Sequence, residues 1–267
     1  MFETSQFLLQ GKVALITGGG RGIGQAIAFA FAKAGAKVVI TSRKVQDLEA
    51  TANEIKAFGG EAFPLPAHLG KTDEIKKMIN TVMEKFSRID ILVNNAGASP
   101  AISSVLESDE RLWDTIMNLN LKGAYFVSQA VANIMVRQGG GKIINIASVD
   151  GFIPEHGVSI YSISKAGMRM LSKAFANELN SFNIQVSTIA PGPINTKMMN
   201  SHWGHLSPEE AQKAKEAVEK MLPSGRIGNP DEIAGAAVYL ASAASNYTTG
   251  TEIVIDGGLL LGNRLSG

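Results

Sequence analysis

The fold is decided by the segment Val13-Ala14-Leu15-Ile16-Thr17-Gly18-Gly19-Gly20-Arg21-Gly22-Ile23-Gly24, near the start of a chain of 267 residues. The apolar run 13–16 ends in glycines, as expected of a short strand that is buried on both faces. Residues 22–34 have a helical pattern that ends at Gly35, a predicted helix C-cap. A strand, a glycine-rich turn and a helix in this order are typical of a phosphate site at a helix N-terminus.

The rest of the chain continues this alternation of strands and helices. We expect strands at 38–40, 63–66, 89–93, 142–147, 184–189 and 252–255, and helices at 45–57, 72–86, 109–136, 159–180 and 231–242. The segment 109–136 is predicted as one long helix or as a bent pair. Helices between successive strands imply right-handed crossovers and a parallel sheet that is covered on both faces. The predicted fold is α/β: a Rossmann-like, doubly wound sheet of seven parallel strands in a single domain that spans residues 1–267.

One long stretch, 193–229, departs from this pattern. It contains Met198, Met199 and Trp203, followed by a charged helical run at 208–220. Long excursions in compact domains are often lids or binding loops. We predict a substrate lid here; the alternative is a surface insertion without a role in binding.

The glycines at 18, 22 and 24 have the spacing GxxxGxG, which is related to the GxGxxG of dinucleotide-binding folds. Glycine lets the backbone adopt positive φ and approach a pyrophosphate closely. The following helix presents free N–H groups and the positive end of its dipole to the phosphates. The segment therefore predicts a dinucleotide site.

The second predicted strand ends in Thr41-Ser42-Arg43, without a carboxylate. An enzyme that uses NAD usually has an acid there, bound to the ribose 2′-hydroxyl. A carboxylate would repel the 2′-phosphate of NADP, whereas an arginine binds it bidentately. We predict NADP(H), bound by Arg43, by Ser42 as a hydrogen-bond donor and by Arg21 as a second clamp. The alternative is an NAD-linked alcohol dehydrogenase in which Arg43 is a solvated surface charge.

Tyr161 and Lys165 lie near the start of the helix predicted at 159–180, and residues four apart share one helix face. A phenol has an ordinary pKa of about 10, and a nearby ammonium lowers it. Tyr161 is therefore a candidate acid/base for a carbonyl or an alcohol, with its pKa lowered by Lys165 and by an oxidised nicotinamide. Ser148 follows the fifth predicted strand, where it can orient the substrate oxygen.

Together these motifs resemble the short-chain dehydrogenase/reductase family over nearly the whole chain. Thr17 to Gly24 resembles the family's TGxxxGxG motif, and the remaining motifs follow in order: Asn94-Asn95-Ala96-Gly97 (NNAG), Asn120 in the helix, Ser148 with Tyr161 and Lys165, Pro191-Gly192 with Thr196 (PGxxxT), and Asp256-Gly257-Gly258 (DGG). Asn118 lies close to Asn120 but fits the family spacing less well.

The resemblance implies a role for each residue. Tyr161 exchanges the proton, Ser148 steadies the oxygen, Lys165 binds the ribose and tunes Tyr161, and Asn120 anchors a water relay. The chain departs from the family at His68-Leu69, where an aspartate usually contacts the adenine; His68 can still accept a hydrogen bond. The predicted cofactor contacts are Gly18, Arg21, Gly22, Ile23, Gly24, Ser42, Arg43, His68, Leu69, Asn95, Ala96, Gly97, Tyr161, Lys165, Pro191, Gly192, Ile194 and Thr196. The predicted substrate contacts are Ser148, Asp150, Phe152, Tyr161, Met198, Met199 and Trp203.

Composition limits the possible partners. The chain has 25 Lys plus Arg and 24 Asp plus Glu, a balance that offers no broad charge for nucleic acid or an anionic membrane. The absence of cysteine excludes disulfides, zinc–thiolate sites and cysteine nucleophiles. Residues 1–12 lack the pattern of a signal peptide, and no apolar run approaches the roughly 20 residues of a membrane span. We predict a cytoplasmic protein with a small-molecule carbonyl substrate and no nucleic-acid or membrane partner.

The predicted function is NADPH-dependent, reversible reduction of a ketone or other carbonyl to a secondary alcohol. The alternatives are a 3-oxoacyl-thioester (acyl-carrier-protein) reductase and a non-catalytic dinucleotide-binding sensor. The segments 137–141 and 180–183, which we place near the entrance, have little basic character for docking an acidic carrier protein. His202 and His205 have the spacing of a chelate but no third ligand nearby, so we predict no metal. The resemblance implies a homotetramer or homodimer, with Leu259-Leu260-Leu261 buried at its interface.

Overall fold

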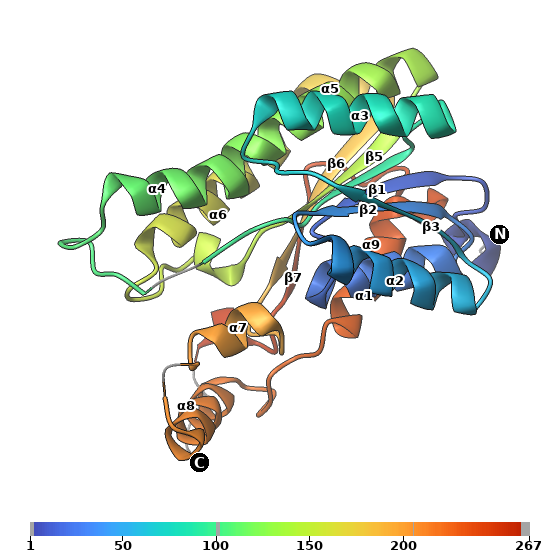
Figure 1. The fold of residues 1–267 in the computed structure, drawn as a ribbon. Coiled ribbons are helices and arrows are strands. Elements are labelled where there is room, and N and C mark those ends of the chain that lie inside the picture. Colours follow the sequence, from blue (N-terminus) through green and yellow to red (C-terminus); the bar gives the residue numbers. More distant parts are fainter. Residues whose placement is uncertain (1–2, 100–101, 205, 263–267) are drawn as a thin grey trace.

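The computed structural model describes residues 3–99, 102–204 and 206–262. All seven predicted strands are present and form one parallel sheet in the order β3-β2-β1-β4-β5-β6-β7, which confirms the predicted fold class (Figure 1). The strands are β1 (Val13–Thr17), β2 (Lys37–Ser42), β3 (Glu61–Pro66), β4 (Ile91–Asn94), β5 (Gly141–Ile146), β6 (Ile184–Pro191) and β7 (Glu252–Ile255).

Helices cover both faces of the sheet. Figure 1 shows α3, α4, α5 and α6 on one side and α1, α2 and α9 on the other. Their bounds are α1 (Gly22–Lys33), α2 (Val45–Ala57), α3 (Thr72–Phe86), α4 (Glu110–Met117), α5 (Ala124–Gln138), α6 (Ser159–Leu179), α7 (Lys197–Ser201), α8 (Pro208–Met221) and α9 (Asp231–Ala241).

Two apolar clusters hold these layers together, because successive side chains of a strand point to opposite faces. In β1, Ala14 and Ile16 pack with the helices α1, α2 and α9, whereas Val13 and Leu15 pack with α3, α5 and α6. All four side chains are buried. This explains why the central strands read as continuous apolar runs rather than as alternating ones.

The chain changes direction between β1 and β4. From β1 it proceeds outward to β2 and β3, then returns to pair β4 with the other edge of β1. Doubly wound sheets bind ligands in the crevice beyond the carboxyl ends of the strands at such a switch point. The glycine-rich turn after β1 and the Asn94–Gly97 segment after β4 therefore meet at this crevice.

The segment predicted as one long helix or a bent pair is an interrupted helix. A π-helical turn, Asn118–Gly123, separates α4 from α5. π-turns inside α-helices are rare and frequently occur at functional sites. This one places Asn120 in the interior, where its side chain is fully buried.

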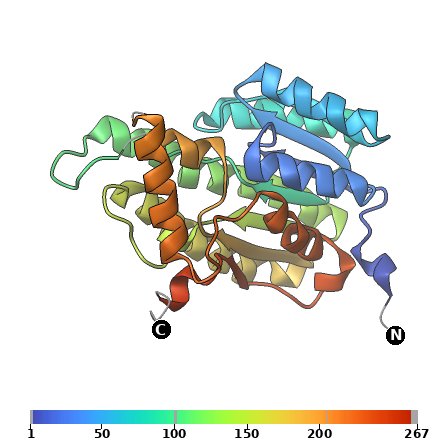
Figure 2. The same cartoon turned by 90° about the horizontal axis from the view of Figure 1, so that it is seen from below.

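The excursion 193–229 contains α7 and α8, which lie apart from the two helix layers (Figures 1 and 2). Ser207 and Glu210 form a capping box that starts α8. No side chain of α8, all of whose residues are described, is fully buried. The location agrees with the predicted excursion; its action as a lid stays a prediction. None of the helices in the described ranges is long and apolar enough to cross a membrane.

Gly24 offers a test of the packing between α1 and the switch point. A Cβ added there would overlap the carbonyl oxygen of Gly18 and the side-chain nitrogen of Asn95. We expect Gly24→Ala to destabilise the protein by about 1–3 kcal/mol, the usual cost of overpacking. Thermal unfolding followed by circular dichroism should show a melting temperature lowered by about 2–4 °C for each kcal/mol.

The matched control is Gly235→Ala in α9. No atom lies within 4 Å of a Cβ added at that exposed position. Alanine is the better helix former by about 1 kcal/mol, so this variant should melt at or above the wild-type temperature. A Gly24→Ala protein as stable as Gly235→Ala would contradict the proposed close packing.

Candidate active site

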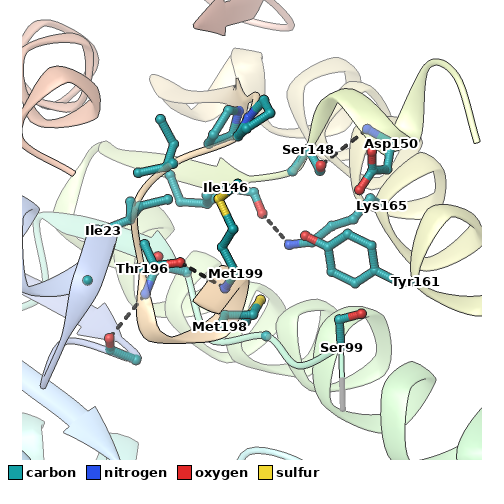
Figure 3. Close-up of a pocket in the computed structure, with 18 of the residues that line it drawn as sticks. Ile23, Ser99, Ile146, Ser148, Asp150, Tyr161, Lys165, Thr196, Met198 and Met199 are labelled. Carbon is teal, nitrogen blue, oxygen red and sulfur yellow. Dashed lines mark hydrogen bonds between the residues drawn. The ribbon is translucent and has the colours of Figure 1, made fainter. Parts of the chain in front are cut away.

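A cavity of about 670 Å³ lies beyond the carboxyl ends of the central strands. Its walls come from the glycine-rich turn, the ends of β2, β4, β5 and β6, the first turns of α6, and α7 with α8 (Figure 3). Segments far apart in the sequence therefore share one pocket. Of the predicted catalytic and binding residues, it is lined by Gly18, Arg21, Gly22, Ile23, Ser42, Arg43, Leu69, Asn95, Ala96, Gly97, Ser148, Asp150, Tyr161, Lys165, Pro191, Gly192, Ile194, Thr196, Met198, Met199 and Trp203.

The glycine-rich turn has the geometry of a phosphate cradle. Gly18 and Gly22 have φ values of 67° and 56°, in the left-handed region that favours glycine. Arg21 is the N-cap of α1, and its side chain makes no capping hydrogen bond. The first N–H groups of α1 therefore have no side-chain cap, and the helix dipole adds positive potential beside the cavity. These features fit a dinucleotide pyrophosphate.

A network of hydrogen bonds joins the glycine-rich turn to the segment after β4. The Thr17 hydroxyl oxygen accepts from the backbone N–H groups of Asn95 and Ala96 at 2.9 and 3.0 Å. In return, the Asn95 side-chain nitrogen donates to the carbonyl oxygens of Thr17 and Gly18 at 2.9 and 3.1 Å. Asn95 thus acts on the cofactor site by shaping the glycine-rich turn.

Two arginines lie at the end of the cavity nearest β2. Arg21 and Arg43 are exposed and line the cavity, and within the described ranges neither forms an ion pair. Asp47 occupies the first turn of α2, and a Cβ on Gly20 would lie 3.1 Å from its Cβ. This end of the cavity therefore presents two free guanidinium groups and one carboxylate.

His68 and Gly24 do not line the cavity, unlike their predicted neighbours. The His68 Nδ1 accepts a hydrogen bond from Gly70 N at 3.1 Å, so this nitrogen is occupied within its own turn. Leu69, the next residue, does line the cavity. Gly24 lies in the interface between α1 and the turn, where it has the packing role described above.

The PGxxxT segment is held by the end of β7. Gly192 N donates to Ile255 O at 2.9 Å, and a Cβ on Gly192 would lie 2.7 Å from the Asp256 Cα. Thr196 caps α7 by accepting from Met199 N at 3.3 Å. Its Cγ2 would lie 3.3 Å from a Cβ on Gly22, so the start of α7 rests against the phosphate cradle.

Ser148, Tyr161 and Lys165 converge on the same side of the cavity (Figure 3). Tyr161 and Lys165 belong to the first two turns of α6, as predicted. The Lys165 Nζ donates to Ile146 O at 2.8 Å and lies 5.5 Å from the centre of the Tyr161 ring. Lys165 is only 4% exposed, so its ammonium is held in place by β5.

Asn120 approaches this group from the π-helical turn. Its side-chain oxygen accepts from Ala98 N at 2.8 Å, and its side-chain nitrogen donates to Ala98 O at 3.0 Å and to the Ser164 hydroxyl at 3.1 Å. A Cβ on Gly97 would lie 3.5 Å from the Asn120 Oδ1 and 3.6 Å from the Lys165 Nζ. Asn120 and Lys165 are therefore neighbours, although Asn120 does not line the cavity; the water relay stays a prediction.

The ionisation of Tyr161 differs from the sequence-based expectation. Burial, and next the negative charge of Asp150, raise the pKa of the Tyr161 phenol above its ordinary value, whereas hydrogen bonding with Ser148 opposes them. Burial lowers the pKa of Lys165 to about 8, and Asp150 counteracts this shift. Desolvation therefore outweighs the stabilisation of a phenolate by the neighbouring ammonium. Tyr161 is held as a neutral acid that can donate its proton.

The substrate end of the cavity contains four of the predicted residues, Asp150, Met198, Met199 and Trp203. Phe152 does not line it, so that prediction is wrong. The Phe152 ring instead lies under the Arg169 guanidinium, 3.3 Å from its carbon to the ring centre. Residues outside the predicted set of substrate contacts that also line the cavity include Ser99, Ile153, Glu155, Leu222, Leu259 and Leu260.

For Leu259 and Leu260, the prediction from the sequence pointed to a different location. Leu259 and Leu260 were predicted at a subunit interface with Leu261, yet both line the cavity, whereas Leu261 is 90% exposed. Leu260 N donates to the Asp256 carboxylate at 2.8 Å, which turns the chain back toward the pocket. An apolar tripeptide alone does not reveal such a turn.

The structure places segments 137–141 and 180–183 away from the entrance of the cavity. The prediction that they lie near that entrance is therefore wrong. Gly141 N donates to Asn183 O at 3.2 Å, at the amino ends of β5 and β6. The cavity opens at the carboxyl ends of these strands. The charge of 137–141 and 180–183 therefore carries no information about carrier docking at the site.

The histidines have different surroundings. The His202 Nε2 lies 3.2 Å from Ser99 O, which links the end of α7 to the loop after β4. His205 lies outside the described residues, and His156 is exposed and does not line the cavity. Among the described residues, no group of three or more metal-ligating side chains is placed to hold an ion.

The phosphate cradle, the switch-point crevice and the Ser148–Tyr161–Lys165 group define a nicotinamide-dinucleotide dehydrogenase or reductase. Residues 18–260 match the sequence profile of a family described as enoyl-(acyl carrier protein) reductase. The chain belongs to the short-chain dehydrogenase/reductase family, and it is an enzyme that acts on alcohol or carbonyl groups with NAD(P)(H) as its cofactor.

Three similar proteins illustrate this family. The chain is 38% identical to a 3-oxoacyl-[acyl-carrier-protein] reductase of Thermotoga maritima, over 95% of this chain and 99% of the relative. It is 40% identical to a 2-dehydro-3-deoxy-D-gluconate 5-dehydrogenase of Escherichia coli, over 96% and 98%. A solved structure from Agrobacterium tumefaciens, assigned as a 2-deoxy-D-gluconate 3-dehydrogenase with bound NADP, is 37% identical, with a TM-score of 0.85 over 96% and 99% of the chains.

The pH dependence of turnover tests the electrostatics of the site. Asp150 raises the pKa values of both Tyr161 and Lys165. Asp150→Asn removes that charge, so both pKa values fall. If activity requires a protonated Tyr161 or Lys165, kcat/KM for carbonyl reduction declines at high pH, and in the variant this decline begins at lower pH. A steady-state pH profile at saturating cofactor measures the shift; an unchanged or upward-shifted alkaline limb would contradict it.

Proposed function

We propose that this protein reduces a ketone or other carbonyl to a secondary alcohol with NADPH, reversibly. The observation that carries the proposal is the convergence of Ser148, Tyr161 and a buried Lys165 next to a phosphate cradle flanked by two free arginines. The bound nicotinamide supplies the hydride that the carbonyl carbon accepts. The residues of the chain then have to place the carbonyl and supply one proton.

The chain's own residues divide these tasks. The Ser148 Oγ accepts from Asp150 N at 3.1 Å, which fixes the oxygen and leaves the hydroxyl proton to donate to a substrate oxygen. Tyr161 gives its phenolic proton to the oxygen as the C=O double bond becomes a C–O single bond. The Lys165 ammonium stabilises the phenolate that remains. In the reverse direction, the phenolate takes the alcohol proton.

The preference for NADPH rests on the arginines. Arg21 and Arg43 line the cavity near the end of β2 and would hold the 2′-phosphate of NADPH there. Arginine binds phosphate oxygens with two parallel hydrogen bonds, whereas a ribose hydroxyl gains little from it. The Asp47 carboxylate would favour NADH over NADPH. However, Asp47 belongs to the first turn of α2 and not to the strand end, where the acids of NAD-specific enzymes lie.

Substitution of Arg43 tests this preference. A hydrogen bond to a charged group contributes about 1.5–3 kcal/mol, so Arg43→Ala should raise the KM for NADPH by roughly 10- to 150-fold. The KM for NADH should change little, because NADH lacks the phosphate. Arg137→Ala is the matched control: it removes an exposed arginine at the amino end of β5. Equal effects on both cofactors, or equal use of them by the wild type, would contradict the NADPH proposal.

A 3-oxoacyl-thioester reductase is the second candidate function. Similarity to the Thermotoga maritima reductase favours it. Such an enzyme needs a surface for its carrier protein at the mouth of the cavity, where Arg21, Lys44 and Lys197 lie in this chain. Acetoacetyl thioesters of pantetheine and of acyl carrier protein distinguish the two functions: a carrier-dependent reductase turns over the protein-bound substrate with much higher kcat/KM.

The proposed substrate is a hydrophobic or aromatic carbonyl compound, because apolar side chains dominate the far end of the cavity. These are Ile153, Pro154, Met198, Met199, Trp203, Val218, Met221, Leu222, Leu259 and Leu260. The proposed closure of α7 and α8 over the substrate would exclude water from it.

A homotetramer also stays a proposal. It is supported by exposed apolar side chains on α5 and α6, namely Tyr125, Val136, Ile163 and Met170.

Tyr161→Phe tests catalysis against a role in cofactor sensing. Loss of a general acid typically lowers the rate by about 10²- to 10⁴-fold. We expect this loss in NADPH oxidation, followed by absorbance over a panel of ketones, diketones and acetoacetyl thioesters. The dissociation constant for NADPH, measured by fluorescence titration, should change far less. A variant with full turnover would exclude Tyr161 as the acid, and a panel dominated by small, charged ketones would exclude the hydrophobic substrate class.

A further inference from the structure

We propose that the carboxylate of Asp150 binds a hydrogen-bond donor on the substrate next to the reacting carbon, so that the enzyme prefers vicinal hydroxyketones and their diols. The inference rests on the proposed function, because it assumes that the reacting oxygen lies between Ser148 and Tyr161. It adds a polar recognition point to a cavity end that is otherwise mostly apolar.

The position of Asp150 follows from the short 3-10 turn Val149–Gly151. Ser148 caps this turn by accepting from Asp150 N at 3.1 Å, which sets the two residues side by side on the cavity wall (Figure 3). Asp150 is close enough to Tyr161 and Lys165 to raise the pKa values of both. A substrate oxygen bound by Ser148 and Tyr161 therefore has the carboxylate as its neighbour. A donor on the adjacent carbon atom is well placed to reach it.

The turn that carries Asp150 is clamped on its outer side. Arg169 donates to Gly151 O at 2.6 Å, and its guanidinium covers the Phe152 ring. Glu252 of β7 holds the same guanidinium with two hydrogen bonds of 2.8 and 2.9 Å. A Cβ on Gly151 would lie 2.8 Å from the Lys165 carbonyl carbon, so the turn also presses on α6.

This clamp has a consequence for binding. A carboxylate on a fixed turn loses little conformational freedom when a ligand binds, so its hydrogen bond contributes more to affinity. Rigid placement beside Ser148 also favours one distance between the reacting oxygen and the donor. The clamp therefore supports selection of a particular substrate geometry.

The Asp150 carboxylate has no ion-pair partner in the described part of the chain. Hydrogen bonding with Ser148 stabilises the ionised carboxylate, Lys165 and His202 do so over a longer range, and Glu155 repels it. Burial, with Glu155, raises the pKa of Asp150 to about 6, so the group is mostly ionised at neutral pH. A partly buried carboxylate that lines a ligand cavity gains from a donor supplied by the ligand.

The charge also determines which substrates are disfavoured. Asp150 and Glu155 both line the substrate end, and an anionic group close to the carbonyl would be repelled by them. A hydroxyl or an ammonium is attracted instead. Both are hydrogen-bond donors, and the experiment separates them.

The test compares three cyclohexane ligands that differ in one substituent: cyclohexanol, cyclohexane-1,2-diol and 2-aminocyclohexanol. Dissociation constants are measured by ligand-observed NMR titration on NADP⁺-loaded Tyr161→Phe protein, in which binding is separated from turnover. A hydrogen bond to a charged group corresponds to a preference of roughly 10- to 150-fold. We expect at least the lower value for the diol or the amino alcohol over cyclohexanol.

Three further substitutions in the same background locate the preference. Asp150→Leu removes the acceptor and should abolish the preference, whereas Asp150→Asn keeps the shape and a neutral acceptor and should reduce it. Glu178→Gln removes an exposed negative charge on α6, at a residue that does not line the cavity, and should retain it. Thermal unfolding verifies that each variant is folded, and the isosteric Asp150→Asn serves if Asp150→Leu is not.

The outcomes separate the possibilities. A preference for the diol assigns the donor as a hydroxyl, and a preference for the amino alcohol assigns it as an ammonium. Equal binding of all three ligands, a preference unchanged in Asp150→Leu and Asp150→Asn, or a loss in Glu178→Gln as large as in Asp150→Leu overturns the inference. If the preference depends on Asp150 but the wild type oxidises none of the ligands and reduces no carbonyl in the panel, the proposed function fails while the Asp150 contact stands.

Discussion

The hydrogen-bond network between Thr17 and Asn95 is the constraint on which the rest of the site depends. It joins the ends of β1 and β4, which are adjacent in the sheet but separated by two strands and three helices in sequence. Because buried backbone groups must be paired, this network also determines the course of the turn through Gly18. The N-terminus of α1 is thereby aimed across the switch point, and the cavity follows from that direction.

Burial acts in two ways on the catalytic group. It removes part of the water around Tyr161 and most of the water around Lys165, which strengthens the electrostatic interactions of these two groups. It also disfavours both charged forms, so the phenol stays neutral and the pKa of the ammonium falls to about 8. Tyr161 is thus prepared to donate a proton. The charge of Asp150, two residues after Ser148, counteracts the shift at Lys165 and connects substrate recognition with the acid/base group.

Residues outside the family's sequence motifs also hold the catalytic group in place. Arg169 and Glu252 join α6 to β7 and hold the turn that carries Asp150. The π-helical turn places Asn120 against Ala98 and Ser164, so the loop after β4 and the active-site helix are tied together. These polar contacts are partly or fully buried, where a lost partner costs more than it does in water. The site is therefore supported by β7, α6 and the π-turn together.

The sequence by itself determined the strand and helix order, the parallel sheet, the phosphate cradle and the spacing of Ser148, Tyr161 and Lys165, because these depend on local periodicity, glycine conformation and helix geometry. Only the tertiary structure decided that Phe152 lies under Arg169, that Leu259 and Leu260 turn into the cavity, that His68 bonds within its own turn, and that 137–141 lies at the far end of the sheet. It also decided that burial, and not the neighbouring ammonium, dominates the pKa of Tyr161. Each depends on residues distant in the chain, whose contacts and desolvation no local pattern encodes.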